Sequence, residues 1–165
     1  LMKCYNLQRI GAASVALGIA QGAFDLAARY AVDLKQFGRP IGDFQGLQWM
    51  LADMHIQLEC SRLLVYRAAA GGVNGFPDKL EAAAAKVYAA EAAIQVTNLA
   101  LQIFGAIGYS CDLPIERMVR DARMFTIGGG TAQVQRNLIG KEVLAKAGAE
   151  AEPQRKRSTE RAAAA

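Results

Sequence analysis

The stretch from Asp78 to Tyr109 reads DKLEAAAAKVYAAEAAIQVTNLALQIFGAIGY and decides how the chain folds. Alanine, the best helix former, fills its middle. Large apolar residues recur every seven positions, which is the spacing of a helix-bundle seam: Leu80, Val87, Ile94 and Leu101. Asp78 with Glu81 predicts a capping box at the start, and the run from Gly105 predicts the end. One long helix that packs against others is therefore expected.

Helical patterns also cover most of the chain on either side of this stretch. We predict helices over about 7–33, 44–70 and 131–145, with a short one after Pro114. The second carries an apolar stripe at helical spacing: Leu47, Met50, Leu51, Met54 and Leu58. No stretch shows sustained β alternation. The predicted fold class is all-α, an antiparallel bundle of four main helices in a domain over residues 1–147, with residues 148–165 as a disordered tail.

Composition excludes several classes of protein. The 165 residues carry a net charge of +4, and the basic residues gather in the mixed-sign tail without aromatic partners, which argues against nucleic-acid binding. No apolar run approaches the roughly 20 residues of a membrane span. Three cysteines and one histidine offer no zinc spacing, so no metal site and a reduced, cytoplasmic protein are expected. The chain opens without methionine in mid-segment, which suggests a fragment or a separated domain.

Two loops have compositions that helical linkers seldom need. QFGRPIGDFQ, residues 36–45, mixes two phenylalanines with glycines and amides. TIGGGTAQVQR, residues 126–136, places three glycines before a predicted helix start, where backbone N–H groups favour an anion. The second pattern is also typical of an ordinary flexible lead-in to a helix.

Taken in order, these segments resemble the C-terminal helical domain of the acyl-CoA dehydrogenase family. The resemblance covers about Met2 to Leu144 without large gaps. It rests on YNLQRIGAASVALGIAQGAFDLAARYA, QFGRPIGDFQGLQWMLADM, AKVYAAEAA, LQIFGAIGY, ERMVRDAR and the glycine-threonine loop before VQRNLIG. The order and spacing of these pieces are far more specific than any one of them.

The resemblance implies FAD held between subunits of a homotetramer, a dimer of dimers, and an acyl-CoA thioester as substrate. A heteromer is the alternative assembly. A neighbouring subunit's FAD would meet Lys35, Gln36, Phe37, Phe44, Gln45, Gln102, Ile103, Phe104, Gly105 and Ala106. Thr131 and Gln133 would hold the chain's own flavin. The acyl-CoA would face Asn6, Leu7, Arg9 and Gly130.

Two positions depart from the family pattern where its chemistry takes place. Most members carry the proton-abstracting glutamate directly before the Gly-Thr of the final loop, and Gly129 stands there in this chain. Other members carry it on the first long helix before an arginine, where this chain has Gln8. A glutamine amide does not accept a proton at neutral pH. The catalytic positions Gln8 and Gly129 therefore lack the usual base.

Two further departures concern the cofactor. Leu34 replaces an arginine that relatives place against the FAD diphosphate, with Lys35 and Arg39 as candidate substitutes, and Ala106 replaces a glycine. The N-terminal helical and central β-domains of the family are absent from the 165 residues, so the chain alone is expected to be inactive.

Three functions remain open at this point. The first is acyl-CoA dehydrogenation within an FAD flavoprotein, despite the missing glutamate. The second is a base-free reaction in the same pocket, as in the sulfinopropionyl-CoA desulfinases, which resemble this chain in carrying glutamine on the first helix. The third is a non-catalytic partner subunit or helical interaction domain.

Overall fold

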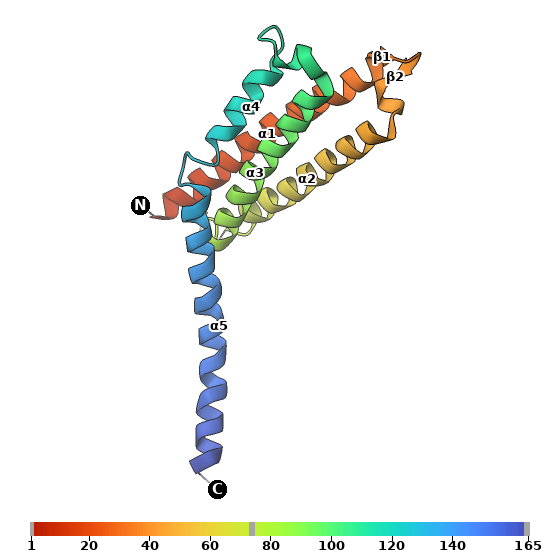
Figure 1. Cartoon of the computed structure of the whole chain (residues 1–165). Coiled ribbons are helices and arrows are strands. Elements are labelled where there is room, and N and C mark those ends of the chain that lie inside the picture. The colour runs from red at the N-terminus through yellow and green to blue at the C-terminus, as the bar shows by residue number, and fades with distance from the viewer. Residues whose placement is uncertain (1, 73–74, 164–165) are drawn as a thin grey trace.

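The computed structural model describes residues 2–72 and 75–163, with side chains over 4–72 and 75–149. Five helices make up most of it: α1 Met2–Asp33, α2 Gln45–Ala70, α3 Lys79–Phe104, α4 Ile115–Met124 and α5 Ala132–Ala163. The first four run up and down beside one another (Figure 1). The predicted all-α, antiparallel bundle is therefore confirmed.

The centre of the bundle is built from alanine. Helix α3 packs against all four other helices, and most closely against α1. Alanines from both helices are fully or almost fully buried between them: Ala16, Ala20, Ala23, Ala27, Ala90, Ala93 and Ala100. Small side chains let two backbones approach closely while the interior stays densely packed. The larger seven-residue set is only partly interior, since Val87 is buried and its three companions are half-buried.

Both predicted ends of α3 are confirmed, but Glu81 pairs with α2 in addition to standing at the capping-box position. Asp78 caps α3, because its Oδ1 accepts hydrogen bonds from the N–H groups of Leu80 and Glu81 at 2.9 and 3.1 Å. The Glu81 carboxylate lies 3.4 Å from Arg67 Nε, so it joins α3 to α2. Gly105 ends α3 with a positive φ of 64°, and a 3₁₀ helix η2, Gly105–Tyr109, follows.

A small hairpin stands where no strand is expected from the sequence. Strands β1 Lys35–Gln36 and β2 Arg39–Pro40 pair antiparallel, and a 3₁₀ helix η1, Ile41–Asp43, leads into α2. Both residues of the turn have positive φ, 52° at Phe37 and 78° at Gly38. Two positive values at a two-residue turn match the twist of a β-hairpin.

The fourth helix of the bundle is the short α4, which packs against α1 and α3. Helix α5 packs against α3 near its start and then extends away from the bundle (Figure 1). Its assigned range runs to Ala163, beyond the expected end near Ala145. The expectation of disorder over 148–165 lies largely outside the residues whose side chains are described, and it stays a prediction.

Two helical segments, Cys4–Asp33 and Lys79–Tyr109, are long and apolar enough to cross a bilayer by length and composition. The expectation that no run of that length exists is wrong by this measure. Both segments belong to the central α1–α3 pair, and the core helix of a bundle satisfies the same measure.

Candidate functional site

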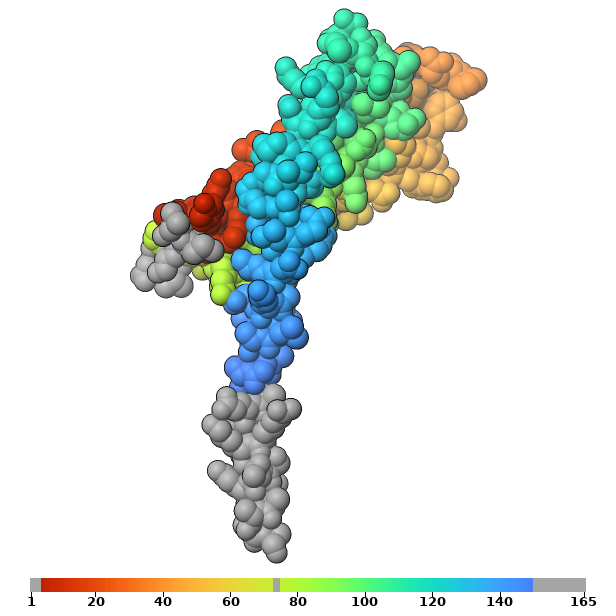
Figure 2. Space-filling model, turned by 60° about the vertical axis from the view of Figure 1, so that its left-hand side comes forward, coloured from red at the N-terminus to blue at the C-terminus, as the bar shows by residue number. Residues whose placement is uncertain are grey.

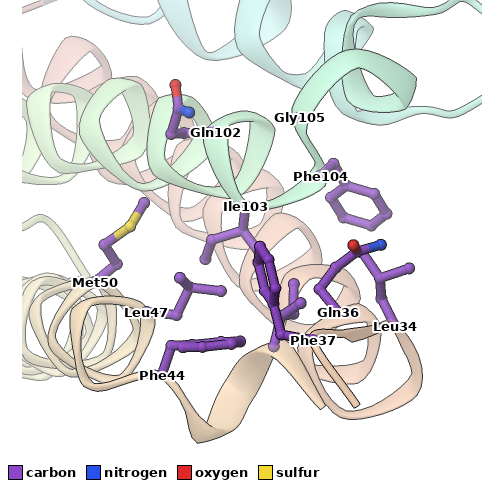
Figure 3. Close-up of a pocket in the computed structure, with 11 residues that line it drawn as sticks. Leu34, Gln36, Phe37, Phe44, Leu47, Met50, Gln102, Ile103, Phe104 and Gly105 are labelled. Carbon is purple, nitrogen blue, oxygen red and sulfur yellow. The ribbon is translucent and has the colours of Figure 1, made fainter. Parts of the chain in front are cut away.

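The hairpin and the end of α3 enclose a hollow of about 490 Å³. Figure 3 shows Phe37, Phe44 and Leu47 on one side of it and Ile103 of α3 on the other. Seven of the expected cofactor-binding residues line it: Gln36, Phe37, Phe44, Gln102, Ile103, Phe104 and Gly105. The remaining lining is apolar. It includes Leu34, which stands where relatives place an arginine against the FAD diphosphate, and three residues not expected there from the sequence: Ile41, Leu47 and Met50. Lys35, Gln45 and Ala106 are exposed and are not among the lining residues.

Aromatic rings dominate the mouth of this hollow. Phe37 is 93% exposed despite its positive φ, and its ring meets Phe44 edge-on at 6.2 Å between centroids. The guanidinium of Arg39 lies 4.1 Å from the centre of the Phe44 ring. A flat hollow with aromatic walls, two amides and a cation at its rim suits an aromatic heterocycle linked to an anion.

A second hollow, of about 310 Å³, lies beside the glycine loop that joins α4 to α5. Its lining brings together Thr131 and Gln133, both expected from the sequence, with Glu91, Arg123 and Thr126. The Thr131 hydroxyl accepts a hydrogen bond from the Val134 N–H at 3.2 Å and so caps α5. The start of α5 therefore supplies the positive end of a long helix to this hollow.

Ion pairing fixes the edge of the second hollow. Glu91 receives two hydrogen bonds of 2.7 Å from the guanidinium of Arg136, and these bonds hold the pKa of its carboxyl below the usual value. Arg123 donates to the Thr126 hydroxyl at 2.9 Å. Glu91 and Arg123 carry ordinary helix-surface signals in the sequence, so only the fold reveals that they share this hollow with Thr131.

The two positions that lack the base lie at the same end of the bundle. The start of α1 and the start of α5 share one face in both overall views (Figures 1 and 2). Gln8 is exposed on α1, and Gly129 is exposed with a φ of 69°. A Cβ placed on Gly129 would meet no atom within 4 Å, so the space that a side chain would enter is open.

The expected acyl-CoA residues differ in exposure. Leu7 is 48% exposed, whereas Asn6 and Arg9 are both buried. Arg9 donates to the Asn6 side chain at 2.7 Å, and Asn6 donates to the Pro77 carbonyl at 3.1 Å. Gly130 has a φ of 91°, which favours glycine, and a Cβ there would lie 2.5 Å from the Gln135 amide nitrogen, so the Gln135 side chain would have to move for any other residue.

One residue of this region was missed from the sequence. Lys86 of α3 is 1% exposed, and its ammonium donates to the Gly130 carbonyl at 2.6 Å. Burial, together with the nearby charge of Arg9, lowers the pKa of Lys86. A lysine within an alanine-rich helix is expected to be exposed to solvent, and no feature of the sequence predicts that the Lys86 side chain points into the bundle.

The hairpin hollow and the glycine loop lie at different heights along the bundle. On α3, Lys86 contacts the loop and Gln102 lines the hollow, and the 16 residues of helix from one to the other span about 24 Å at 1.5 Å per residue. Within the described residues, no group of three or more His, Cys, Asp or Glu side chains could hold a metal ion.

Comparison with known proteins identifies the family of the chain. Residues 1–144 match the family model for the acyl-CoA dehydrogenase C-terminal domain. The chain is 67% identical over 144 residues to the 3-sulfinopropanoyl-CoA desulfinase of Paraburkholderia xenovorans strain LB400, covering 87% of this chain and 37% of that protein.

Solved structures share the same arrangement. Butyryl-CoA dehydrogenase from Megasphaera elsdenii superposes with a TM-score of 0.82 at 43% identity, covering 85% of this chain and 37% of that one. The structure described as PigA with FAD and proline gives 0.80 at 26% identity, covering 84% and 36%. The chain thus spans little more than a third of each of these relatives. On the match of residues 1–144, the chain belongs to the acyl-CoA dehydrogenase family, whose C-terminal domain it comprises.

Proposed function

We propose that the chain forms the flavin- and acyl-CoA-binding C-terminal part of a base-free acyl-CoA flavoprotein that releases sulfite from a sulfinated acyl-CoA. The observation that carries this proposal is a contrast between the binding positions and the base positions. Nine of the expected cofactor-binding residues line two hollows, while Gln8 and Gly129 leave both base positions without a carboxylate.

The residues present fit FAD. The hairpin hollow offers Phe37, Phe44 and Gln102 to an adenine and its linkage, with the Arg39 cation close to Phe44. Thr131, Gln133 and the start of α5 would face the flavin side of a second FAD. The two hollows are separate, since α3 lines one through Glu91 and the other through Gln102, and this supports FAD sites shared between subunits. FAD supplies the hydride acceptor for oxidation reactions of this family.

The proposed reaction needs no proton abstraction by a glutamate. The carbon–sulfur bond of a 3-sulfinoacyl thioester breaks and its electron pair stays on carbon, which takes up a proton. The sulfur leaves as SO₂, and one water hydrates it to hydrogensulfite with release of a proton. No net electron transfer to the flavin occurs. The 67% identity with a desulfinase supports this choice of substrate class.

Dehydrogenation of a saturated acyl-CoA is the second candidate function. The likeness to butyryl-CoA dehydrogenase favours it. In this reaction a base removes a proton next to the thioester while a hydride leaves the following carbon. Without a carboxylate at Gln8 or Gly129, the base would have to come from residues outside this chain.

The test compares both reactions in an FAD-loaded protein that contains this chain together with the N-terminal helical and central β-domains of the family. We expect sulfite release from 3-sulfinopropanoyl-CoA without loss of the oxidised flavin absorbance, and no bleaching by butyryl-CoA. Bleaching by butyryl-CoA without sulfite release would establish the dehydrogenase instead. A colourless protein that takes up no FAD would leave only the non-catalytic partner. The 165 residues alone are expected to catalyse neither reaction.

We also propose that the protein assembles with further copies of itself, as a homotetramer or within a heteromer, in the cytoplasm. Large apolar residues stand exposed on α2 at the seven-residue spacing of a helix seam: Trp49, Ile56 and Leu63. Sedimentation equilibrium of the FAD-loaded protein should give four copies, and a monomer would contradict this assembly.

A further inference from the structure

Two buried cations lie next to each other beneath the glycine loop. Lys86 is 1% exposed and Arg9 is 8% exposed, and they come from the central helices α3 and α1. Their hydrogen-bond acceptors are neutral oxygens, the Gly130 carbonyl and the Asn6 amide. Burying a positive charge is costly unless a negative charge offsets it.

No carboxylate in the described part of the chain offsets these charges. Five ion pairs join described side chains, and neither Arg9 nor Lys86 takes part in any of them. Arg9 Nε is also buried without a hydrogen-bond partner in this part of the chain. The pair is close enough for the charge of Arg9 to lower the pKa of Lys86.

The lack of a carboxylate near Lys86 and Arg9 occurs next to Gly129, the position where relatives carry the catalytic glutamate. Lys86 binds the carbonyl of Gly130, the residue directly after Gly129. A glutamate at Gly129 would bring a carboxylate to the loop that Lys86 contacts, and the open space beside Gly129 would accept a ligand group instead. Because charges interact more strongly away from water, a substrate anion near the loop gains from both cations without touching them.

We propose that Lys86 is a positioning and specificity residue of the acyl-CoA site, holding the glycine loop through Gly130 and, with Arg9, favouring an acyl group that is itself anionic. This inference rests on the acyl-CoA binding proposed above. It adds that the anionic end of the substrate replaces the glutamate carboxylate that other members of the family carry.

Succinyl-CoA and butyryl-CoA test the inference, because they differ only in a carboxylate or a methyl at the end of a four-carbon chain. Equilibrium binding to the FAD-loaded protein should favour succinyl-CoA at least about tenfold at low salt. Raising the ionic strength should reduce that preference, since screening weakens attraction between charges. The Lys86→Met variant should lose the preference through weaker succinyl-CoA binding, and Lys86→Arg should restore much of it.

Lys141→Met, an exposed lysine on α5, is the matched control and should leave both affinities unchanged. If Lys86→Met does not fold, Arg9→Gln and the salt dependence of the wild type test the same charge. Equal binding of both thioesters by the wild type, or equal losses for both in Lys86→Met, would overturn the inference while acyl-CoA binding stands. Binding of neither thioester would overturn the proposed function and this inference with it.

Discussion

At the scale of single residues, the site is defined by two positions that carry no carboxylate and by the glycine loop next to one of them. Gln8 and Gly129 are exposed at the same end of the bundle, so a side chain at either could reach a bound thioester. The absence of a carboxylate at these two positions could be predicted from the sequence, because the residue types alone define it. The partner of Gly130 could not be read in this way, because Lys86 lies 44 residues before it in the sequence.

Gln8→Glu should give the FAD-loaded protein an acyl-CoA dehydrogenase activity. A carboxylate at this position accepts the proton that an amide refuses, and general-base catalysis contributes about 100-fold to 10,000-fold in rate. Bleaching of the flavin by butyryl-CoA, followed by absorbance, measures it. Gln8→Leu removes the amide without supplying a base and should show no gain. A folded, FAD-loaded Glu variant without bleaching would argue against Gln8 lying near the reacting carbon.

Gly129→Ala should lower the free energy of unfolding by about 1 kcal/mol, because its φ of 69° is unfavourable for a residue with a Cβ. Steric overlap plays no part, since nothing lies within 4 Å of that Cβ. Urea unfolding measures the change. Gly140→Ala in the exposed interior of α5 is the matched control and should be neutral or stabilising by up to about 1 kcal/mol. Equal effects at both glycines would contradict the role of φ.

At the scale of elements, prediction succeeded where pattern determines structure and failed where packing does. The cap at Asp78 and the break at Gly105 follow from local chemistry, and both are observed. The hairpin has strands of only two residues each, too short for any alternation to appear in the sequence. The seven-residue seam of α3 was incomplete because helices surround α3, so its alanines became the interior.

A substitution at Phe37 in the hairpin turn should change FAD binding without lowering the stability of the fold. Phe37 carries a positive φ that asparagine adopts more readily, and its ring is 93% exposed, so little burial is lost. Phe37→Asn should therefore keep or slightly raise the free energy of unfolding. The same variant should weaken FAD binding by about tenfold, because stacking of a base on an aromatic ring contributes about 1–3 kcal/mol.

Fluorescence titration of the apoprotein with FAD measures the affinity of the Phe37 variant. Tyr66→Asn, which removes an exposed aromatic ring from α2, serves as the control and should bind FAD normally. Normal FAD affinity in Phe37→Asn would remove Phe37 from the cofactor site.

The ion pair between Glu91 of α3 and Arg136 of α5 predicts that the free energy of unfolding depends on pH. The hydrogen bonds from Arg136 hold the pKa of Glu91 below its usual value in the folded chain. The pair therefore stabilises the fold above the usual pKa of a glutamate, and this contribution is lost as pH falls through the lowered pKa. Both side chains are more than a third exposed, so solvent limits the contribution to at most about 1 kcal/mol.

Arg136→Met should therefore cost stability at pH 7 and none at strongly acidic pH. Carbon-13 NMR of the Glu91 carboxyl should show its pKa rise in the variant. Arg120→Met breaks the pair with Glu116 on the exposed face of α4 and is the control, because the Glu91 pKa should not respond to it. An unchanged Glu91 pKa in Arg136→Met would contradict the assignment.

At the scale of the whole molecule, the bundle places two kinds of binding residue at opposite ends of α1. The hairpin hollow lies at one end and the glycine loop, which Lys86 contacts, lies towards the other, about 24 Å apart along α3. The family resemblance assigns both ends to flavin sites. The buried cation pair required the fold, because only the packing of α1 against α3 brings Arg9 and Lys86 together.

The boundary of the folded unit gives the last prediction. Along α5, Leu138, Ile139 and Glu142 are half-buried, and Glu142 pairs with Lys79 at 2.6 Å. Beyond them Val143 and Leu144 are 52% and 73% exposed, so packing ends there among the residues up to 149 whose side chains are described. A chain ending at residue 147 should keep the free energy of unfolding within about 0.5 kcal/mol of the full chain, whereas one ending at residue 137 should lose about 2 kcal/mol or more, because it no longer buries two aliphatic side chains. Urea unfolding of the three chains measures both differences. A large loss in the 147-residue chain would mean that the segment after it packs on the bundle, and the domain would then extend past the predicted boundary.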